Sequence, residues 1–382
     1  MTVEPSNPGI DTKYTGRVGV QQRLLPSYRV VFFDTLAAAC SRGLSVFAGE
    51  PGRGEAITTT QKLNVASYYF ARNWHFGRTD STYYFLWQRG LIAWLEYWQP
   101  DALILEANPR YKTSRQAIRW MHARQRPVIG WGLGAPPYTS RSPFTDFLRK
   151  YRKDFLLSFD ALIAYSQRGA EEYRAEGFPI GKIYVAQNAV TKRPVDLFPE
   201  RMAQPGKPCT ILFVGRLQAR KRIDNLLVAC ASLPLTIRPR LWIVGDGPAR
   251  EEFEELAQKI YPATQFLGAV HGPELVTLFR EADLFVLPGT GGLAVQEAMA
   301  YGLPVIVAEG DGTQNDLVRS ENGWLVPSDD QGGLQLALQE ALSNPDRLRS
   351  MGRESYRIVS QDINVEKMVE VFVQALNHIR VS

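Results

Sequence analysis

Short apolar runs recur along the second half of the chain, and the segments between them carry apolar residues three or four positions apart. Apolar runs of this length predict buried strands, and the spacing between them predicts helices. The runs lie at 209–214, 240–244, 264–267, 283–287, 304–307 and 323–326. Strands that are apolar on both faces and alternate with helices indicate a parallel sheet covered on both sides. We therefore expect a doubly wound α/β domain.

The first half shows the same alternation less regularly. Strands are expected near 17–22, 44–48, 101–105, 127–131, 160–164 and 182–185, and helices near 28–41, 83–98, 112–125, 143–158 and 167–177. The Pro- and Gly-containing stretch 193–208 reads as a linker. We expect an N-terminal domain over 1–200 and a C-terminal domain over 201–382. A last helix at about 364–378 could pack on either domain.

Composition separates the two halves. The chain has 382 residues, 45% hydrophobic and 22% charged, with a net charge of +5, as in an ordinary globular protein. Residues 1–205 carry 27 Lys and Arg against 17 Asp and Glu, whereas the remainder carries 17 against 22. The first half also holds six of the eight Trp. The basic half and the acidic half are therefore expected to bind different partners.

Several classes of protein fit this sequence poorly. No apolar run approaches the roughly 18 residues that a membrane span requires, and the polar first residues do not resemble a signal peptide. Three scattered Cys offer neither a disulfide framework nor metal-ligand spacing, which favours a reducing cytoplasm. No nucleic-acid-binding module is recognisable in the basic half, so no nucleic acid is expected as a partner.

Loops that follow strands in the second half contain candidates for anion binding. Gly215 permits close backbone approach, and Arg216 and Lys221 are spaced to grip two phosphates of one diphosphate. A solvated basic loop is the alternative. Gly247 follows the next strand, where a structural turn explains it as well as a phosphate does.

A third loop, Gly289 to Leu293, has three glycines before a helix and can expose backbone N–H groups to an anion. Glu297 lies one turn into that helix, where it can accept hydrogen bonds from two neighbouring sugar hydroxyls. A favourable interaction with the helix dipole is its alternative explanation.

Five motifs follow one another in this half: ILFVGRLQARKRIDNLLVA, LWIVGDGPAREEFEELA, FLGAVHGPELVTLFREADLFVLP, GGLAVQEAMAYGLPVIVAEGDGTQNDLV and NGWLVP. Over about 150 residues their order and spacing closely resemble the C-terminal half of the retaining glycosyltransferases of family 4. The resemblance implies the GT-B architecture, an α/β fold of two facing Rossmann-like, doubly wound domains with a cleft between them. The first half fits the family more loosely.

The resemblance also implies roles for individual residues. Arg216 and Lys221 match the pair that neutralises the donor diphosphate and stabilises the leaving group, and Glu297 matches the acid that holds the ribose hydroxyls. The positions that match the backbone around the donor are Gly215, Gly247, Gly291, Gly292 and Leu293. No metal and no cofactor besides the nucleotide-sugar substrate is implied, and a UDP-sugar is the favoured donor.

Two positions depart from the family. The family has a second Glu eight residues before the ribose-binding one, and this chain has Gly289 there, in a loop that is about three residues shorter. The family's Lys-Gly pair is Lys221-Arg222 here. Contact with the donor sugar must therefore differ, and the identity of that sugar stays open.

The acceptor is expected on the basic, Trp-rich half. Asn108 and Arg110 follow one expected strand and suit hydroxyls or phosphate, and Trp131 follows the next and suits a sugar ring. The Trp and Leu residues between Trp87 and Trp98 fall at helical spacing and indicate core packing. The segment 144–159 places aromatic residues on one helical face beside a basic cluster, which predicts either an anionic-membrane contact or a helix packed on the core.

These observations predict a retaining, metal-independent hexosyltransferase that acts on a glycan or lipid-linked acceptor. The expected location is the cytoplasm, with a peripheral position at the inner face of the membrane. Two alternatives stay open: a sugar-nucleotide 2-epimerase of the same architecture, and a non-catalytic nucleotide-sugar-binding assembly partner.

Overall fold

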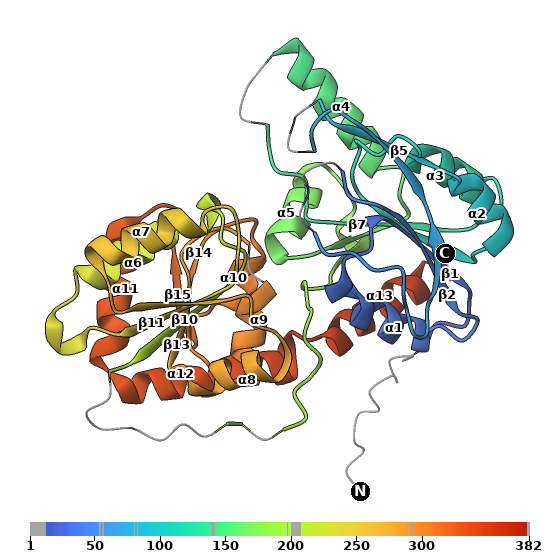
Figure 1. Cartoon of the computed structure of the whole chain (residues 1–382). Helices are drawn as coiled ribbons and strands as arrows, with labels where there is room; N and C mark the ends of the chain where they lie inside the picture. Colours follow the sequence, from blue (N-terminus) through green and yellow to red (C-terminus); the bar gives the residue numbers. More distant parts are fainter. Residues whose placement is uncertain are drawn as a thin grey trace, which may run out of the picture. The chain divides into compact units, whose positions relative to one another are not determined.

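The chain forms two compact units (Figure 1). The computed structural model describes residues 13–52, 55, 57–79, 81, 83–138, 142–196, 198–199, 208–291 and 293–379. Unit 1 comprises residues 1–188 and 365–382, and unit 2 comprises residues 189–364. The predicted boundary at residue 200 thus lies inside unit 2, and the last helix returns to unit 1. Each unit is described by itself.

Unit 2 contains a six-stranded parallel sheet in the order β12-β11-β10-β13-β14-β15. The strands are β10 (Thr210–Val214), β11 (Arg240–Val244), β12 (Thr264–Gly268), β13 (Leu284–Leu287), β14 (Val305–Ala308) and β15 (Gly323–Val326). The helices between and after them are α6 (Ile223–Ala231), α7 (Arg250–Ile260), α8 (Gly272–Glu281), α9 (Leu293–Ala300), α10 (Thr313–Leu317), α11 (Gln331–Ser343) and α12 (Pro345–Arg357). All six predicted strands are confirmed. Strands β10, β13 and β14 lie inside the sheet, and their apolar side chains are buried on both faces.

Unit 1 contains a seven-stranded parallel sheet in the order β3-β2-β1-β6-β7-β8-β9. Its strands are β1 (Val18–Leu24), β2 (Leu44–Gly49), β3 (Ser67–Phe70), β6 (Ala102–Glu106), β7 (Val128–Gly132), β8 (Ala161–Ala164) and β9 (Ile183–Val185). Its helices are α1 (Val30–Ala38), α2 (Leu91–Trp98), α3 (Ser114–His122), α4 (Pro143–Leu156), α5 (Gln167–Ala175) and α13 (Val365–His378). The predicted doubly wound α/β class is confirmed for both units, and the cleft between them stays a prediction.

One predicted helix is wrong. Residues 83–98 divide into strand β5 (Phe85–Arg89) and helix α2, and β5 pairs antiparallel with β4 (Arg72–Phe76). Gly90 separates the two elements with a φ of 93°, a left-handed conformation that Gly adopts without a steric penalty. Trp87 therefore lies in a strand, whereas Leu91 and Trp94 pack in the core from α2.

Helix α13 completes the core of unit 1 from the far end of the sequence. The Phe372 ring lies 5.0 Å from the Phe32 ring of α1 and 5.0 Å from the Trp131 ring of β7, measured between ring centroids. The Tyr184 hydroxyl and the Nδ1 atom of His378 are 2.9 Å apart, within hydrogen-bonding distance. These contacts join residues more than 190 positions apart in the chain.

Candidate functional site

The strand order of unit 2 marks one edge of its sheet as the place for a ligand. From β10 the chain proceeds outward to β11 and β12, and then returns to β13 on the other side of β10. Ligands of open α/β sheets bind beyond the carboxyl ends of the two strands where the order reverses. Here those strands are β10 and β13, which are followed by Gly215 and by the loop that starts at Pro288. Apart from Gly247, which follows β11, the candidate anion-binding residues follow these two strands.

Glycines let the loops at this edge pack backbone against backbone. A Cβ on Gly247 would lie 2.8 Å from the backbone nitrogen of Leu217, so only Gly permits the approach of the two loops. The Leu217 amide donates to the Asp246 carbonyl over 2.9 Å and closes the same contact. The structure thus accounts for Gly247 by loop packing, and its contact with a donor stays a prediction.

Lys221 is the buried cation of this edge. It lies in a short 3-10 turn, Ala219–Lys221, and the residue is only 7% exposed. Its Nζ atom donates to the Thr290 carbonyl over 2.8 Å, and a Cβ on Gly291 would lie 3.0 Å from that nitrogen. Burial, helped by the Arg220 charge, lowers the pKa of Lys221 to about 8. The structure brings Lys221 and Gly291 together across nearly 70 residues of sequence.

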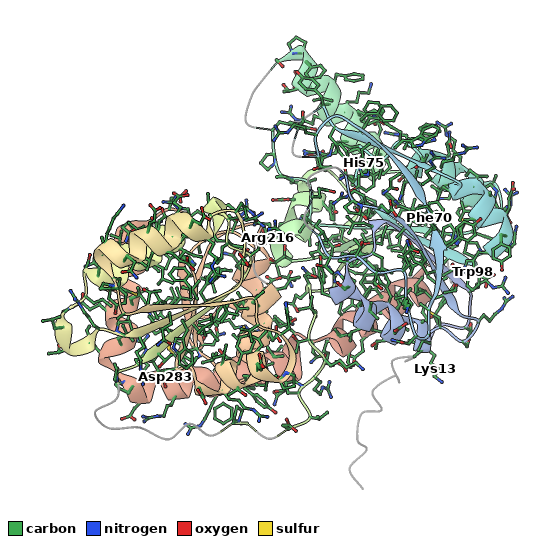
Figure 2. All side chains as sticks on the ribbon, viewed as in Figure 1. Lys13, Phe70, His75, Trp98, Arg216 and Asp283 are labelled. Carbon is green, nitrogen blue, oxygen red and sulfur yellow. The ribbon has the colours of Figure 1, made fainter. Side chains whose placement is uncertain are left out.

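Two arginines accompany Lys221 in different ways. Arg216 is exposed directly after Gly215 (Figure 2). Within the described residues its guanidinium has no hydrogen bond or ion pair. Arg220, which the sequence analysis did not select, donates from Nη1 to the Thr290 carbonyl over 3.2 Å. Its place beside Lys221 in the basic run was the available signal. Together with Arg222, these three cations make four in the loop after β10.

Arg222 stands where the family has the Gly of its Lys-Gly pair, and the structure shows how the loop accommodates it. Its φ of 52° is left-handed, which is the conformation that favours Gly. The guanidinium compensates by donating to the Asn225 side chain over 2.8 Å and by pairing with Asp224 and Asp329. Arg222 therefore serves the fold of the loop with its side chain.

Gly289 occupies the position of the family's first Glu, and the structure shows why no side chain fits. A Cβ there would lie 2.5 Å from the carbonyl carbon and 2.7 Å from the Cα atom of Lys221. The neighbouring Thr290 amide donates to the Arg220 carbonyl over 3.1 Å and holds the loop in place. The shortened loop is thus pressed against the turn that carries Lys221.

Glu297 presents a half-buried carboxylate near the start of α9. Burial raises its pKa, and among the described residues no hydrogen bond or ion pair compensates the charge. By contrast, the side-chain amide of the adjacent Gln296 is hydrogen-bonded through both its oxygen and its nitrogen: the oxygen accepts from the Val190 amide, and the nitrogen donates to the Ile363 carbonyl. Leu293 begins the helix, and Gly292 lies outside the described residues.

Unit 1 has its own reversal of strand order, between β1 and β6. Asn108 and Arg110 follow β6 and interact, because the Asn108 Oδ1 atom accepts from the Arg110 amide over 3.1 Å. Arg110 is exposed, and its guanidinium lies 5.7 Å from the centre of the Tyr84 ring. Both candidate acceptor residues thus lie at the edge where a ligand is expected.

Buried polar side chains fill the space next to them. Arg23, near the end of β1, pairs with Glu55 over 2.5 Å, and its amide donates to Glu106 over 2.5 Å. Burial raises the pKa of Glu106 although Arg23 and the Tyr111 hydroxyl oppose the shift. This cluster was not among the predicted site residues, because its members come from segments far apart in the chain.

Trp131 is not available to an acceptor, so this prediction is wrong. The residue is fully buried within β7, which ends at Gly132, one residue beyond the expected strand at 127–131. Its ring lies among Phe32, Phe372 and the Arg29 guanidinium, which is 5.2 Å from the ring centre. Trp131 therefore contributes to the core of unit 1.

The aromatic face of 144–159 serves two different purposes along its length. Phe155 and Phe159 are buried in the core, as the packing interpretation requires, whereas Phe144 and Phe147 are 52% and 61% exposed. Arg152 is also buried and pairs with Glu176, so it does not belong to a solvated basic face. None of the helices in the described part of the chain has the length and apolar character to cross a membrane.

The described residues contain no group of three or more His, Cys, Asp or Glu side chains arranged to hold a metal ion. Independence from metal stays a prediction.

Comparisons with known proteins agree with this arrangement. Residues 196–358 match the family model of the group 1 glycosyl transferases. The chain is 28% identical over 242 residues to the putative colanic acid biosynthesis glycosyltransferase WcaL of Salmonella typhimurium, covering 59% of this chain and 58% of the relative. It is 37% identical over 145 residues to a GDP-mannose-dependent alpha-mannosyltransferase of Mycobacterium tuberculosis, covering 37% and 34%. The match therefore spans less than two thirds of these relatives.

Similarity to solved structures extends over nearly the whole chain. Anabaena Alr3699/HepE in complex with UDP superposes with a TM-score of 0.67 at 14% identity, covering 95% of this chain and 99% of that one. Identity at this level establishes the fold alone. Residues 196–358 are therefore similar to a group 1 glycosyl transferase domain, and the chain has the GT-B fold.

Proposed function

We propose that this chain is a retaining, metal-independent glycosyltransferase that moves a hexose from a nucleoside-diphosphate sugar to a glycan or lipid-linked acceptor. The observation that carries the proposal is the buried Lys221 beside Gly291, at the reversal point of the unit 2 sheet. A buried ammonium that no carboxylate neutralises within the described part of the chain favours a multiply charged anion at this place. The group 1 family match over the same unit supports the assignment.

The chemistry that these residues supply is charge stabilisation. When the bond to the anomeric carbon breaks, negative charge develops on the departing diphosphate. Lys221, whose pKa of about 8 leaves it mainly protonated at neutral pH, and the exposed Arg216 stabilise that charge. The acceptor hydroxyl attacks from the face that the diphosphate leaves and gives its proton to the departing diphosphate oxygen, so the anomeric configuration is retained.

Glu297 holds the nucleotide in this proposal. Its uncompensated carboxylate accepts hydrogen bonds from two adjacent ribose hydroxyls, which replace the water that burial partly removes. A UDP-sugar is the first donor to test, since the Anabaena neighbour was solved with UDP. The mycobacterial relative is GDP-mannose-dependent, so GDP-sugars belong in the same panel.

The test measures nucleoside diphosphate release from UDP-, GDP- and ADP-sugars, with and without acceptor and with a chelator present. Arg216→Ala and Lys221→Ala are each expected to lower turnover by about 100-fold or more, the usual cost of losing a group that stabilises developing charge. Lys259→Ala, at an exposed lysine of α7, is the matched control. Near-normal turnover in both variants would refute the assignment.

A non-catalytic nucleotide-sugar binder is the second candidate, and Gly289 favours it. The family's Glu at this position touches the donor sugar, whereas the loop here has no room for a side chain. Donor binding without nucleotide release, under every acceptor tried, would select this function. Conversion of the donor sugar to its isomer without acceptor would instead select the epimerase.

We propose a cytoplasmic location with peripheral attachment to an anionic membrane through the start of α4. Phe144 and Phe147 are exposed there, and Arg149 and Lys150 lie on the next turn. Phe144→Ser with Phe147→Ser is expected to abolish co-sedimentation with phosphatidylglycerol vesicles, whereas Tyr97→Ser, at an exposed aromatic residue of α2, leaves it intact. Unchanged co-sedimentation of the double variant would contradict the proposed membrane attachment.

A further inference from the structure

Unit 1 contains a cavity that the donor site does not involve. It has a volume of about 800 Å³ and lies between the loop after β7, helix α4 and helix α5. Small-molecule sites typically measure about 300–1,000 Å³, so a monosaccharide with a phosphate fits this volume. Its lining is mostly charged, with cations from α4 and α5 and carboxylates from the same two helices.

Only part of this charge is neutralised within the cavity wall. Arg149 pairs with Asp146 over 3.0 Å, Arg168 pairs with Glu172 over 3.3 Å, and Arg152 pairs with Glu176. Among the described residues, this leaves three charged lining side chains without a hydrogen bond or ion pair: Lys150, Lys153 and Glu171. The two lysines are three positions apart on α4 and therefore lie on one face of the helix.

The wall of the cavity is held in place by Arg152, which is only 8% exposed. Its Nη1 atom donates to the Pro136 carbonyl over 2.7 Å, and its guanidinium lies 4.5 Å from the centre of the Tyr138 ring. Its Nε atom is buried and has no hydrogen-bond partner. Arg152 thus holds the cavity wall through its two Nη atoms, one on the Pro136 carbonyl and one on the Glu176 carboxylate.

The mixture of groups identifies a class of ligand. Free lysines donate to phosphate oxygens, a free carboxylate accepts from sugar hydroxyls, and the Tyr138 and Pro137 side chains offer an apolar surface to a sugar ring. We propose that this cavity binds a sugar phosphate, as the phosphate-bearing part of the acceptor substrate. Only the ligand's role as acceptor rests on the proposed glycosyl transfer, because binding of the sugar phosphate is independent of catalysis.

The first test uses the full chain and measures binding of glucose 1-phosphate by calorimetry, with glucose and inorganic phosphate as partial ligands. The Lys150→Gln, Lys153→Gln double variant is expected to bind glucose 1-phosphate at least about tenfold more weakly, because two charge-assisted contacts are lost. Lys62→Gln with Lys182→Gln removes the same charge at exposed lysines elsewhere in unit 1 and is the matched control.

Three results would overturn the proposal. Glucose 1-phosphate fails to bind, binds no better than inorganic phosphate, or binds equally to both double variants. Binding of UDP is measured in parallel and is expected to be the same in all three proteins. Nucleotide release without sugar-phosphate binding refutes the cavity and leaves the transferase standing, whereas sugar-phosphate binding without release refutes the transferase alone.

A second arm identifies the source of the phosphate. A short-chain prenyl diphosphate sugar and a free hexose phosphate compete against labelled glucose 1-phosphate. Stronger competition by the prenyl compound supports a lipid-linked acceptor, and equal or stronger competition by the free sugar phosphate supports a soluble one. Failure of both to compete shows that the labelled probe is bound elsewhere and overturns the proposal.

Discussion

The reversal points of the two sheets are built in opposite ways. At the β10 and β13 edge of unit 2, glycine backbones lie against one another, and Arg216 and Glu297 have no compensating partner among the described residues. At the β1 and β6 edge of unit 1, side chains fill the space and bind one another, as Arg23 does with Glu55. The same topology thus yields one edge made for the close approach of an anion and another with a preformed polar wall.

The two sheet edges are therefore suited to different kinds of ligand. Uncompensated charges gain most when a ligand of opposite charge arrives, so the unit 2 edge is suited to strong, charge-dependent binding. Groups that already bind one another gain little from a ligand, so the unit 1 edge is suited to orienting a neutral hydroxyl. Four substitutions or conditions test this contrast, from the largest expected effect to the smallest.

Trp131→Ala tests whether the aromatic residue belongs to the core or to the acceptor site. We expect a loss of about 3–5 kcal/mol in the free energy of unfolding, because a fully buried ring is removed from between Phe32 and Phe372. Chemical denaturation measures it. Trp74→Ala, at a ring that is 42% exposed, is the control and should cost much less. Equal costs would contradict the core assignment.

Gly289→Ala tests whether the unit 2 edge depends on backbone contact. The added Cβ would lie within 2.7 Å of the Lys221 Cα atom, so the loop must shift, at a cost of about 1–3 kcal/mol. Thermal unfolding and the dissociation constant for UDP measure the effect, and both should worsen. Gly181→Ala meets no heavy atom within 4 Å and should change neither. A neutral Gly289→Ala would mean that the loop is not held against the turn.

The pH dependence of donor binding tests the charge on Lys221. Its ammonium form is fully present below its pKa of about 8 and is lost above it, so affinity for UDP should be constant below that pH and fall above it. The fall should approach about tenfold per pH unit, which corresponds to about 1.4 kcal/mol. Titration calorimetry at constant ionic strength measures it. Lys221→Arg, which stays charged, should flatten the profile, and a profile unchanged by that substitution would exclude Lys221 as the titrating group.

Arg110→Ala tests the unit 1 edge with the smallest expected effect. The residue is exposed, so stability should change by no more than about 0.5 kcal/mol. The KM for the acceptor should rise about fivefold, the cost of roughly 1 kcal/mol for one hydrogen bond, with the affinity for UDP unchanged. Arg124→Ala, whose guanidinium also lies over an aromatic ring, is the control outside this edge. An unchanged acceptor KM would remove Arg110 from the acceptor site.

The parallel strands other than β3 were predictable because they are short, largely apolar runs bounded by turn residues. β3 was missed, because its mostly exposed residues Ser67–Phe70 do not form a buried apolar run. The hairpin of β4 and β5 was not predicted, since the alternation of Trp74 and Phe76 with polar residues in β4 covers only five positions. Trp87 of β5 also falls at helical spacing with residues of α2. Gly90 between them was the signal for the break.

The two sheet edges also differed in how far their residues could be predicted from the sequence. Glycines and cations that follow strands are visible in the sequence, so Lys221 and Gly291 could be selected before their contact was known. The reason for Gly289 could not, because the backbone that excludes a side chain there lies almost 70 residues away. The Arg23, Glu55 and Glu106 cluster was hidden for the same reason, since three separate segments meet in it.

The return of helix α13 to unit 1 has a consequence for how the protein is made. Phe372 is part of the core that surrounds Trp131, so the first unit to emerge from the ribosome lacks a piece of its interior until translation has passed residue 372. Unit 2, which is continuous from residue 189 to 364, has its whole sequence available earlier. Domains generally fold as units during synthesis. The later half of the polypeptide is therefore expected to mature first, and the earlier half to wait for its final helix.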